Sequence, residues 1–286
     1  MKVKSLAIGK AKGSAGNLTY TTLGDETIAK AKVSFPSNPK TPAQMERRVQ
    51  LSNLVNMFQA LRPYQKLAFQ TATGRVSDYN RFVGNNLGIV RVYLTKKEAI
   101  GGAVVVAPYM ITDGELPSIA NEIASGVLKS DIDLSSLSLD EETTVADFST
   151  AVLNGNTGRF MEGDQISLIN VEQRVNSVTA IPFVVVSVFE VTLDTAASTR
   201  MFVDLGGADL ISVVDGKLGS SFAVNGGAAI IHSRKAGDGS TLVSQQYLTV
   251  ANSILAQYQS DSQKLAAILS YGGNTSVAFL TPNIGE

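Results

Sequence analysis

The chain has 286 residues, of which 44% are hydrophobic and 17% charged, a composition that allows a buried core and excludes a disordered protein. It has no cysteine, which excludes disulfides, thiolate metal ligands and a cysteine nucleophile, and fits a reducing compartment. The longest apolar run, residues 181–191, is too short to span a bilayer as a helix, and residues 1–20 lack the apolar core of a signal peptide. We therefore expect a soluble protein that does not enter a membrane.

The net charge of −1 conceals two oppositely charged parts. Residues 1–100 contain 16 basic and 5 acidic side chains, which gives +11, and residues 101–286 contain 8 basic and 20 acidic ones, which gives −12. A basic segment of this kind suggests binding to nucleic acid, a membrane or an acidic protein. A further alternative is self-association, in which the basic part of one copy contacts the acidic part of the next. The simplest alternative is that both parts are only solvated.

The first 35 residues are rich in glycine and are interpreted as an extended arm. Within them, residues 18–33 predict a β-hairpin, because two β-prone runs flank the turn sequence Leu-Gly-Asp-Glu. In the second run Lys30 and Lys32 are two residues apart, so they share one face of the strand. The arm either pairs within its own domain or adds a strand to a neighbouring subunit.

A helix is predicted to begin after Thr41, because Thr41 is a favoured N-cap, Pro42 suits the first helical position and Gln44 completes a capping box. Its expected apolar stripe is Leu51, Leu54, Val55, Phe58 and Leu61. Two shorter helices are predicted over residues 62–72 and after Ser77. Arg47 and Arg48 lie in the first turns, where the helix dipole favours acids, so either a partner explains them or they are ordinary solvated side chains.

From about residue 89, short β-branched or alternating runs separated by turn residues predict a sandwich-like or barrel-like body. These runs are residues 88–95, 102–111, 164–175, 181–194, 200–205, 210–215, 220–224 and 228–234. Residues 129–145 are acidic and rich in serine, and are interpreted as an exposed loop or edge segment. Leu265, Ile268 and Leu269 form the stripe of a C-terminal helix.

The expected fold class is therefore α+β: a glycine-rich N-terminal β arm with short helices, then a β-rich body with a C-terminal helix. The charge distribution predicts two domains. Residues 1–90 form a basic arm plus helical segment, and residues 91–286 form an acidic β-rich domain.

The chain has few residues that are suited to catalysis. His232 is the only histidine, no G-x-S-x-G motif accompanies it, and we interpret it as a structural residue at the end of a strand. One histidine and no cysteine do not make a typical zinc site, and no nucleotide-binding glycine motif occurs. Paired carboxylates of a glycosidase would lack tryptophan for stacking on sugars. We expect no enzyme, no cofactor, no metal and no small-molecule substrate.

The candidate interface residues are instead basic or lie in turns. They are Lys10, Lys12, Gly16, Asn17, Lys30, Lys32, Arg47 and Arg48. The basic members could contact phosphates with strong salt dependence, but no nucleic-acid-binding signature is present. Any contact with DNA is therefore expected to be non-specific.

Several positions in the first 90 residues resemble a family of uncharacterised proteins from Bacteroidales bacteria and their crAss-like gut phages. The shared pattern is Gly16-Asn17, Asn38-Pro39, Thr41 with Gln44 and Arg47, Tyr79-Asn80, Phe82 and Asn86. Residues 228–250 also resemble the C-terminal portion of that family.

The resemblance implies a virion structural protein, assembled in the bacterial host cytoplasm, whose partners are other virion proteins and copies of itself. A ring component of the head-to-tail connector is the first expectation, and a capsid-decorating protein is the alternative. A non-specific DNA-binding accessory protein and a carbohydrate-binding or hydrolytic β-domain are the competing hypotheses.

Overall fold

The computed structural model describes residues 2–3, 12–23, 26–33, 40–64, 76–135, 137–220 and 225–272. The chain divides into two compact units, Met1–Thr41 and Pro42–Glu286, called here the N-terminal unit and the main unit. Helices and antiparallel sheets, with a helix near the C-terminal end, confirm the expected α+β class.

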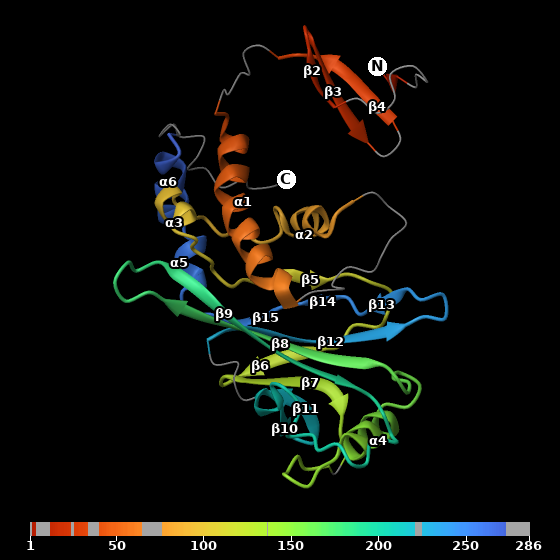
Figure 1. Ribbon diagram of the computed structural model, residues 1–286. Helices are drawn as coiled ribbons and strands as arrows, with labels where there is room; N and C mark the ends of the chain where they lie inside the picture. Colours follow the sequence, from red (N-terminus) through yellow and green to blue (C-terminus); the bar gives the residue numbers. More distant parts are fainter. Residues whose placement is uncertain are drawn as a thin grey trace, which may run out of the picture. The chain divides into compact units, whose positions relative to one another are not determined.

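The N-terminal unit is a four-stranded antiparallel sheet with the order β1-β4-β3-β2 (Figure 1). Its strands are β1 (Lys2–Val3), β2 (Gly13–Ala15), β3 (Leu18–Leu23) and β4 (Glu26–Ala31). The predicted hairpin is confirmed as the β3–β4 pair. Gly16 has φ +56° in the two-residue turn between β2 and β3, at the first central position, where a type II′ turn favours glycine.

The main unit is built on a large antiparallel sheet with the order β13-β12-β8-β9, and β15 also pairs with β12. Its strands are β8 (Gln165–Val175), β9 (Pro182–Thr192), β12 (Gly226–Lys235), β13 (Thr241–Val243) and β15 (Thr249–Ala251). Alternation sends Ile169 and Val171 to one face and Ile166 and Leu168 to the other, and each pair is buried in a different hydrophobic cluster. The sheet therefore separates two cores.

In the described part of the chain, five helices and a two-stranded sheet lie on the first face (Figure 1). The helices are α1 (Pro42–Leu61), α2 (Asp78–Asn86), α3 (Lys96–Ile100), α5 (Leu255–Gln259) and α6 (Asp261–Ser270), and the sheet pairs β5 (Met110–Thr112) with β14 (Gln246–Tyr247). The 3₁₀ turn η1 (Arg62–Tyr64) follows α1. The predicted starts at Pro42 and after Ser77 are confirmed, and Ser77 accepts a hydrogen bond from the backbone N–H of Asn80.

A second sheet lies on the other face, with the order β10-β11-β7-β6 (Figure 1). Its strands are β6 (Asn121–Ala124), β7 (Val127–Asp133), β10 (Ser212–Val214) and β11 (Lys217–Ser220), accompanied by α4 (Val145–Gly155) and the 3₁₀ turn η2 (Ala208–Leu210). Leu128 and Leu218 of this sheet share a core with Leu168 and Phe189 of the large sheet. This packing of sheet on sheet is the sandwich-like part of the body.

Two runs predicted as strands are mostly not strands. In residues 88–95 no strand forms, and of residues 102–111 only the last two belong to β5. Residues 103–107 are buried, but side-chain amides take the place of a neighbouring strand. Val105 exchanges two hydrogen bonds with the Asn53 amide, of 2.8 and 2.9 Å. Gln173 Oε1 accepts from the Val106 N–H at 2.8 Å, and Gln173 Nε2 donates to the Val104 carbonyl at 3.0 Å.

The prediction of an exposed loop or edge for the acidic segment 129–145 is right for the loop between β7 and α4 and wrong at both ends. Residues 129–133 belong to β7, an interior strand whose alternate residues are buried, and Thr144 caps a helix that we did not predict. Residues 200–205 form turns instead of a strand, and residues 221–224 lie outside the described part. Within the predicted helix 62–72, η1 covers the start and the remainder from residue 65 is not described.

The buried face of α1 differs from the predicted stripe. It consists of Met45, Val49, Gln50, Asn53, Leu54, Met57 and Leu61, whereas Leu51 is exposed. Leu54 and Leu61 of α1 and Phe82 of α2 share a core with Ile169 of β8. The two helices therefore belong to the main unit, and the contacts divide the chain at residues 41 and 42, not at residue 90 as the charge distribution suggested.

Candidate interaction surfaces

Three of the candidate lysines share one face of the N-terminal sheet. Thr19 of β3 stands opposite Lys30 on one side and Ser14 on the other, and the Ser14 and Thr19 hydroxyl oxygens are 3.3 Å apart. Lys12 and Lys32 each lie one residue outside the strands β2 and β4, at two residues from Ser14 and Lys30, so alternation continued beyond the strand ends would put them on the same face. All three lysines are exposed.

The remaining candidates are distributed over both units. Gly16 and Asn17 form the exposed β2–β3 turn, where the Asn17 carbonyl accepts from the Lys32 N–H at 2.7 Å. Arg47 and Arg48 belong to α1 of the main unit: Arg47 is exposed with its guanidinium against Gly88, and Arg48 is half-buried. Lys10 lies outside the described residues. The eight residues are thus not one surface of a single unit.

His232 lies within β12 and not at its end, and it is completely buried. Its Nε2 is 2.7 Å from Oδ2 of Asp164. Arg234 donates two hydrogen bonds of 2.7 Å to the same carboxylate, and the Met161 N–H donates a third of 2.8 Å. Burial raises the pKa of Asp164, but the hydrogen bonds from Arg234, His232 and Met161 outweigh it and hold the pKa at about 2.

This buried cluster is suited to stabilising the fold. The His232 ring packs against Phe160 with 4.6 Å between ring centroids, and its Nδ1 has no hydrogen-bond partner among the described residues. Because Asp164 is ionised at neutral pH, Nε2 carries the hydrogen and donates it. Ser244 Oγ accepts from the His232 backbone N–H. Among the described residues no group of three or more His, Asp and Glu side chains could hold a metal ion.

The large sheet ends in an open edge at β9, which pairs with β8 and with no other described strand. At its start the Pro182 carbonyl points outward and accepts from the Val104 N–H at 2.9 Å. Outward backbone groups recur at every second residue of an antiparallel edge strand. Val184, Val186 and Val188 therefore direct their N–H and C=O groups outward, and in the described part of the chain these groups have no hydrogen-bond partner.

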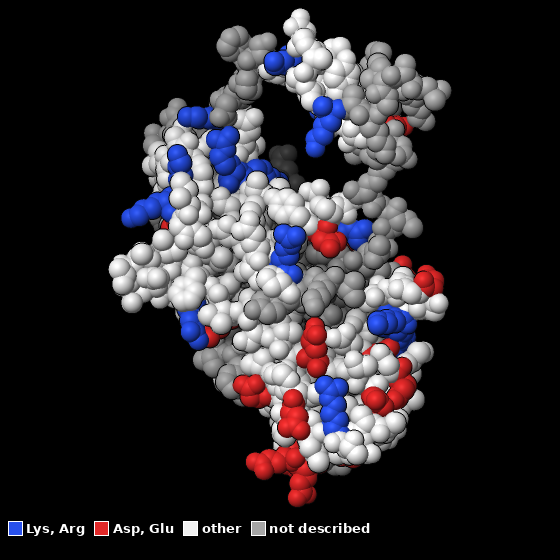
Figure 2. All heavy atoms as spheres, viewed as in Figure 1, with Lys and Arg blue, Asp and Glu red and all other residues white. Residues whose placement is uncertain are grey.

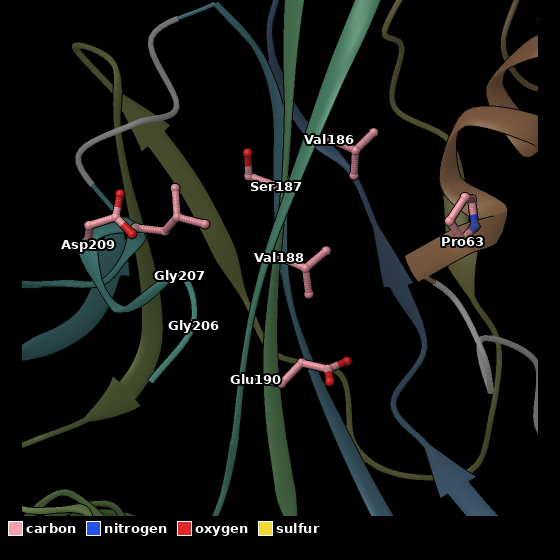
Figure 3. Close-up of a pocket in the computed structure, with 9 residues that line it drawn as sticks. Pro63, Val186, Ser187, Val188, Glu190, Gly206, Gly207 and Asp209 are labelled. Carbon is pink, nitrogen blue, oxygen red and sulfur yellow. The ribbon is translucent and has the colours of Figure 1, made fainter. Parts of the chain in front are cut away.

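The open edge borders a hollow of about 670 Å³ (Figure 3). Pro63 stands on one side and the segment 206–210 on the other. Gly207 comes so close to the Val188 carbonyl that a Cβ at this position would lie 2.6 Å from its oxygen. The lining residues are Pro63, Val186, Ser187, Val188, Glu190, Gly206, Gly207, Asp209 and Leu210.

Charge is unevenly distributed on the face of the main unit that Figure 2 shows. Acidic side chains gather over the end that carries β10, β11 and α4, whereas basic ones gather over α1, α3 and α6. Both charged side chains that line the hollow at β9, Glu190 and Asp209, are acidic.

Sequence reasoning found the strand but missed the edge. The run of β-branched residues predicted β9 correctly, but strand order depends on long-range pairing that no local pattern encodes. The only local signals were a valine-rich strand without a flanking charge on its N-terminal side and the adjacent glycines at 206 and 207.

No family model, curated protein or solved structure matches the chain. In the described ranges, no helix has both the length and the apolar character needed to cross a membrane. The fold and the surfaces define an α+β protein of two units, with a small lysine-bearing sheet and a larger unit that has an open strand edge.

Proposed function

We propose that this chain is a structural protein of a tailed, crAss-like phage virion, and that several copies form a ring in the head-to-tail connector. The observation that carries the proposal is the arm-and-body construction of the chain. A small single-sheet unit is separate from a larger unit that has an unpaired strand edge. The resemblance at several positions between residues 16 and 86 to uncharacterised proteins of Bacteroidales bacteria and their crAss-like phages supports the virion assignment.

The charges of the two units favour assembly. Residues 1–41 contain 7 basic and 2 acidic side chains, which gives +5, and residues 42–286 contain 17 and 23, which gives −6. Contact between the basic unit of one copy and the acidic unit of the next is attractive and repeats head to tail. A repeated contact of this type closes into a ring when its rotation permits. The proposal requires no catalytic step, cofactor or membrane.

Native mass spectrometry of the purified chain across a salt series tests the proposal. We expect a closed oligomer that dissociates as salt rises, because exposed charge pairs are screened within about 8 Å at physiological ionic strength. Mass spectrometry of purified particles then tests whether the chain is part of the virion. A chain that is absent from purified particles contradicts the virion proposal.

The lysine face of the N-terminal sheet favours non-specific DNA binding as the second candidate function. Lys12, Lys30 and Lys32 could each contact one phosphate, and each contact steepens the dependence of log K on log salt by about 0.9. Replacing all three with glutamine would lower the slope by about 2 to 3 if the face binds duplex DNA. An unchanged slope, or no binding at low salt, would remove this candidate.

A further inference from the structure

We propose that the open edge of β9 is a docking site for β2 of a second copy, which extends the large sheet by one strand. The inference deepens the proposed assembly and rests on it. It names the two surfaces that meet: the groove along Val184–Val188 of one copy and the outer edge of Gly13–Ala15 of the next, which pairs with β3 and with no other described strand.

The acceptor edge has a defined length. The Val104–Pro182 hydrogen bond marks one end, and the approach of Gly207 to Val188 marks the other. Between them, the outward N–H and C=O groups of Val184 and Val186 have no partner in the described part of the chain. An open valine-rich edge of this kind readily pairs with another strand. Three residues of an incoming strand would span it.

The groove selects a thin occupant. Its sides are formed by Pro63 and by the segment 206–210 (Figure 3), so a strand embedded in a thick two-layer body would meet these residues before it reached the edge. This disfavours pairing of β9 with β9 of another copy. The N-terminal unit is a single sheet in its described part, so its edge strand can enter between the two sides.

β2 suits the acceptor edge because its backbone has groups that point outward and its side chains are small. Ala15 and Leu18 flank the two-residue turn and form a hydrogen-bonded pair, so Ser14 directs its N–H and C=O away from β3. Gly13, Ser14 and Ala15 are small and exposed, which allows a close approach to the groove.

The charges of the two surfaces are complementary. Lys12 directly precedes β2, and the groove carries Glu190 and Asp209 with no Lys or Arg among its described lining residues. The pairing is therefore expected to weaken with salt, although the backbone hydrogen bonds along the edge will remain.

Two proline variants test the pairing from its two sides. Val186→Pro removes an outward N–H of the acceptor edge, and Ser14→Pro removes an outward N–H of the donor strand. Neither substitution removes a backbone hydrogen bond within its own sheet, and proline is tolerated at such edge positions. The Ser14 hydroxyl, 3.3 Å from that of Thr19, is lost in the proline variant and in the alanine control alike. Val186→Ala and Ser14→Ala are the matched controls, since they shorten the same side chains but keep the N–H. Thermal unfolding of all four variants verifies that they fold.

We expect each proline variant alone to raise the dissociation constant of self-association by about tenfold or more, as the loss of one or two hydrogen bonds predicts. The alanine controls should stay close to the parent chain. A one-to-one mixture of the proline variants should form a heterodimer and no larger species, because one intact donor can meet one intact acceptor. Sedimentation measures the dissociation constants, and native mass spectrometry measures the composition of the mixture.

Four outcomes would overturn the inference. Self-association of Ser14→Pro at the parent level would mean that another segment occupies the groove. A mixture without heterodimer would mean that the two edges do not meet. Protection of the Val186 amide from hydrogen exchange in a monomer would mean that the edge is covered within one copy. A chain that is found in particles but is monomeric alone would contradict this inference and leave the virion proposal intact.

Discussion

Nε2 of His232 lies 2.7 Å from Oδ2 of Asp164, and their side chains are 0% and 1% exposed to solvent. A buried carboxylate of this kind is costly unless it is well paired. Here Arg234 from the same strand as His232 supplies the compensating charge and binds both carboxylate oxygens. Asp164 directly precedes β8, so these bonds fix the start of β8 to β12. Phe160, which packs on the His232 ring, belongs to the adjoining hydrophobic cluster.

Asp164→Asn should therefore destabilise the main unit. The substitution removes the negative charge and leaves Arg234 without its partner, a change expected to cost about 3 kcal/mol of unfolding free energy. Urea unfolding measures it. Glu172→Gln is the matched control, because Glu172 also binds an arginine, Arg174, through two hydrogen bonds but at an exposed site. That control should change stability by less than about 1 kcal/mol, and a comparable loss in both variants would contradict the prediction.

The same carboxylate should make the stability depend on pH in the acidic range. Its pKa falls from an ordinary value of 3.8 to about 2 in the folded protein, so the unfolded chain takes up the proton at higher pH. The stabilisation, about 2 kcal/mol, is complete above pH 4 to 5 and is lost as the pH falls towards 2. Unfolding free energies measured from pH 6 to pH 2 should show this loss in the parent chain and a shallower loss in Asp164→Asn. Equal slopes would argue against the assigned cause.

Local signals predicted the elements that local chemistry determines. The start of α1 at Pro42, the cap at Ser77 and the long runs of β8 and β9 all appear where expected. The segment 103–107 was assigned to a strand because its residues are apolar and β-branched. Such a segment joins a sheet only if another strand lies beside it. Here the side-chain amides of Asn53 and Gln173 lie beside it instead and bind its backbone. These two amides are distant in sequence, so their pairing could not be foreseen.

The candidate site was predictable only in part. The shared face of Lys30 and Lys32 follows from their spacing of two residues if alternation continues past the end of β4. Arg47 and Arg48 follow these lysines in the same basic part of the sequence but belong to the main unit, since α1 packs on the large sheet. The open edge of β9 results from the order in which distant strands pair, which no residue of β9 specifies by itself.

Asn53→Ala should destabilise the main unit through the backbone it supports. Asn53 is completely buried, and its loss leaves the N–H and C=O of Val105 without partners in a dry environment. The Tyr109 hydroxyl loses a hydrogen bond of 2.6 Å at the same time. We expect a loss of about 3 kcal/mol in chemical unfolding. Gln59→Ala, at an exposed position of the same helix, should change stability by less than about 0.5 kcal/mol. A similar effect of both would exclude the backbone pairing as the cause.

The two adjacent glycines beside the β9 groove should respond differently to the same substitution. Gly207 has φ +80°, and a Cβ there would meet the Val188 carbonyl oxygen at 2.6 Å, whereas a Cβ at Gly206 would meet no atom within 4 Å. Gly207→Ala should therefore cost about 2 to 4 kcal/mol, from backbone strain and from displacement of β9 or of the segment 206–210. Gly206→Ala should be neutral or slightly stabilising, because it restricts the unfolded chain. Thermal unfolding of both variants decides the point. A Gly207→Ala chain as stable as Gly206→Ala would mean that the segment does not lie against β9, and the groove would lose one of its sides.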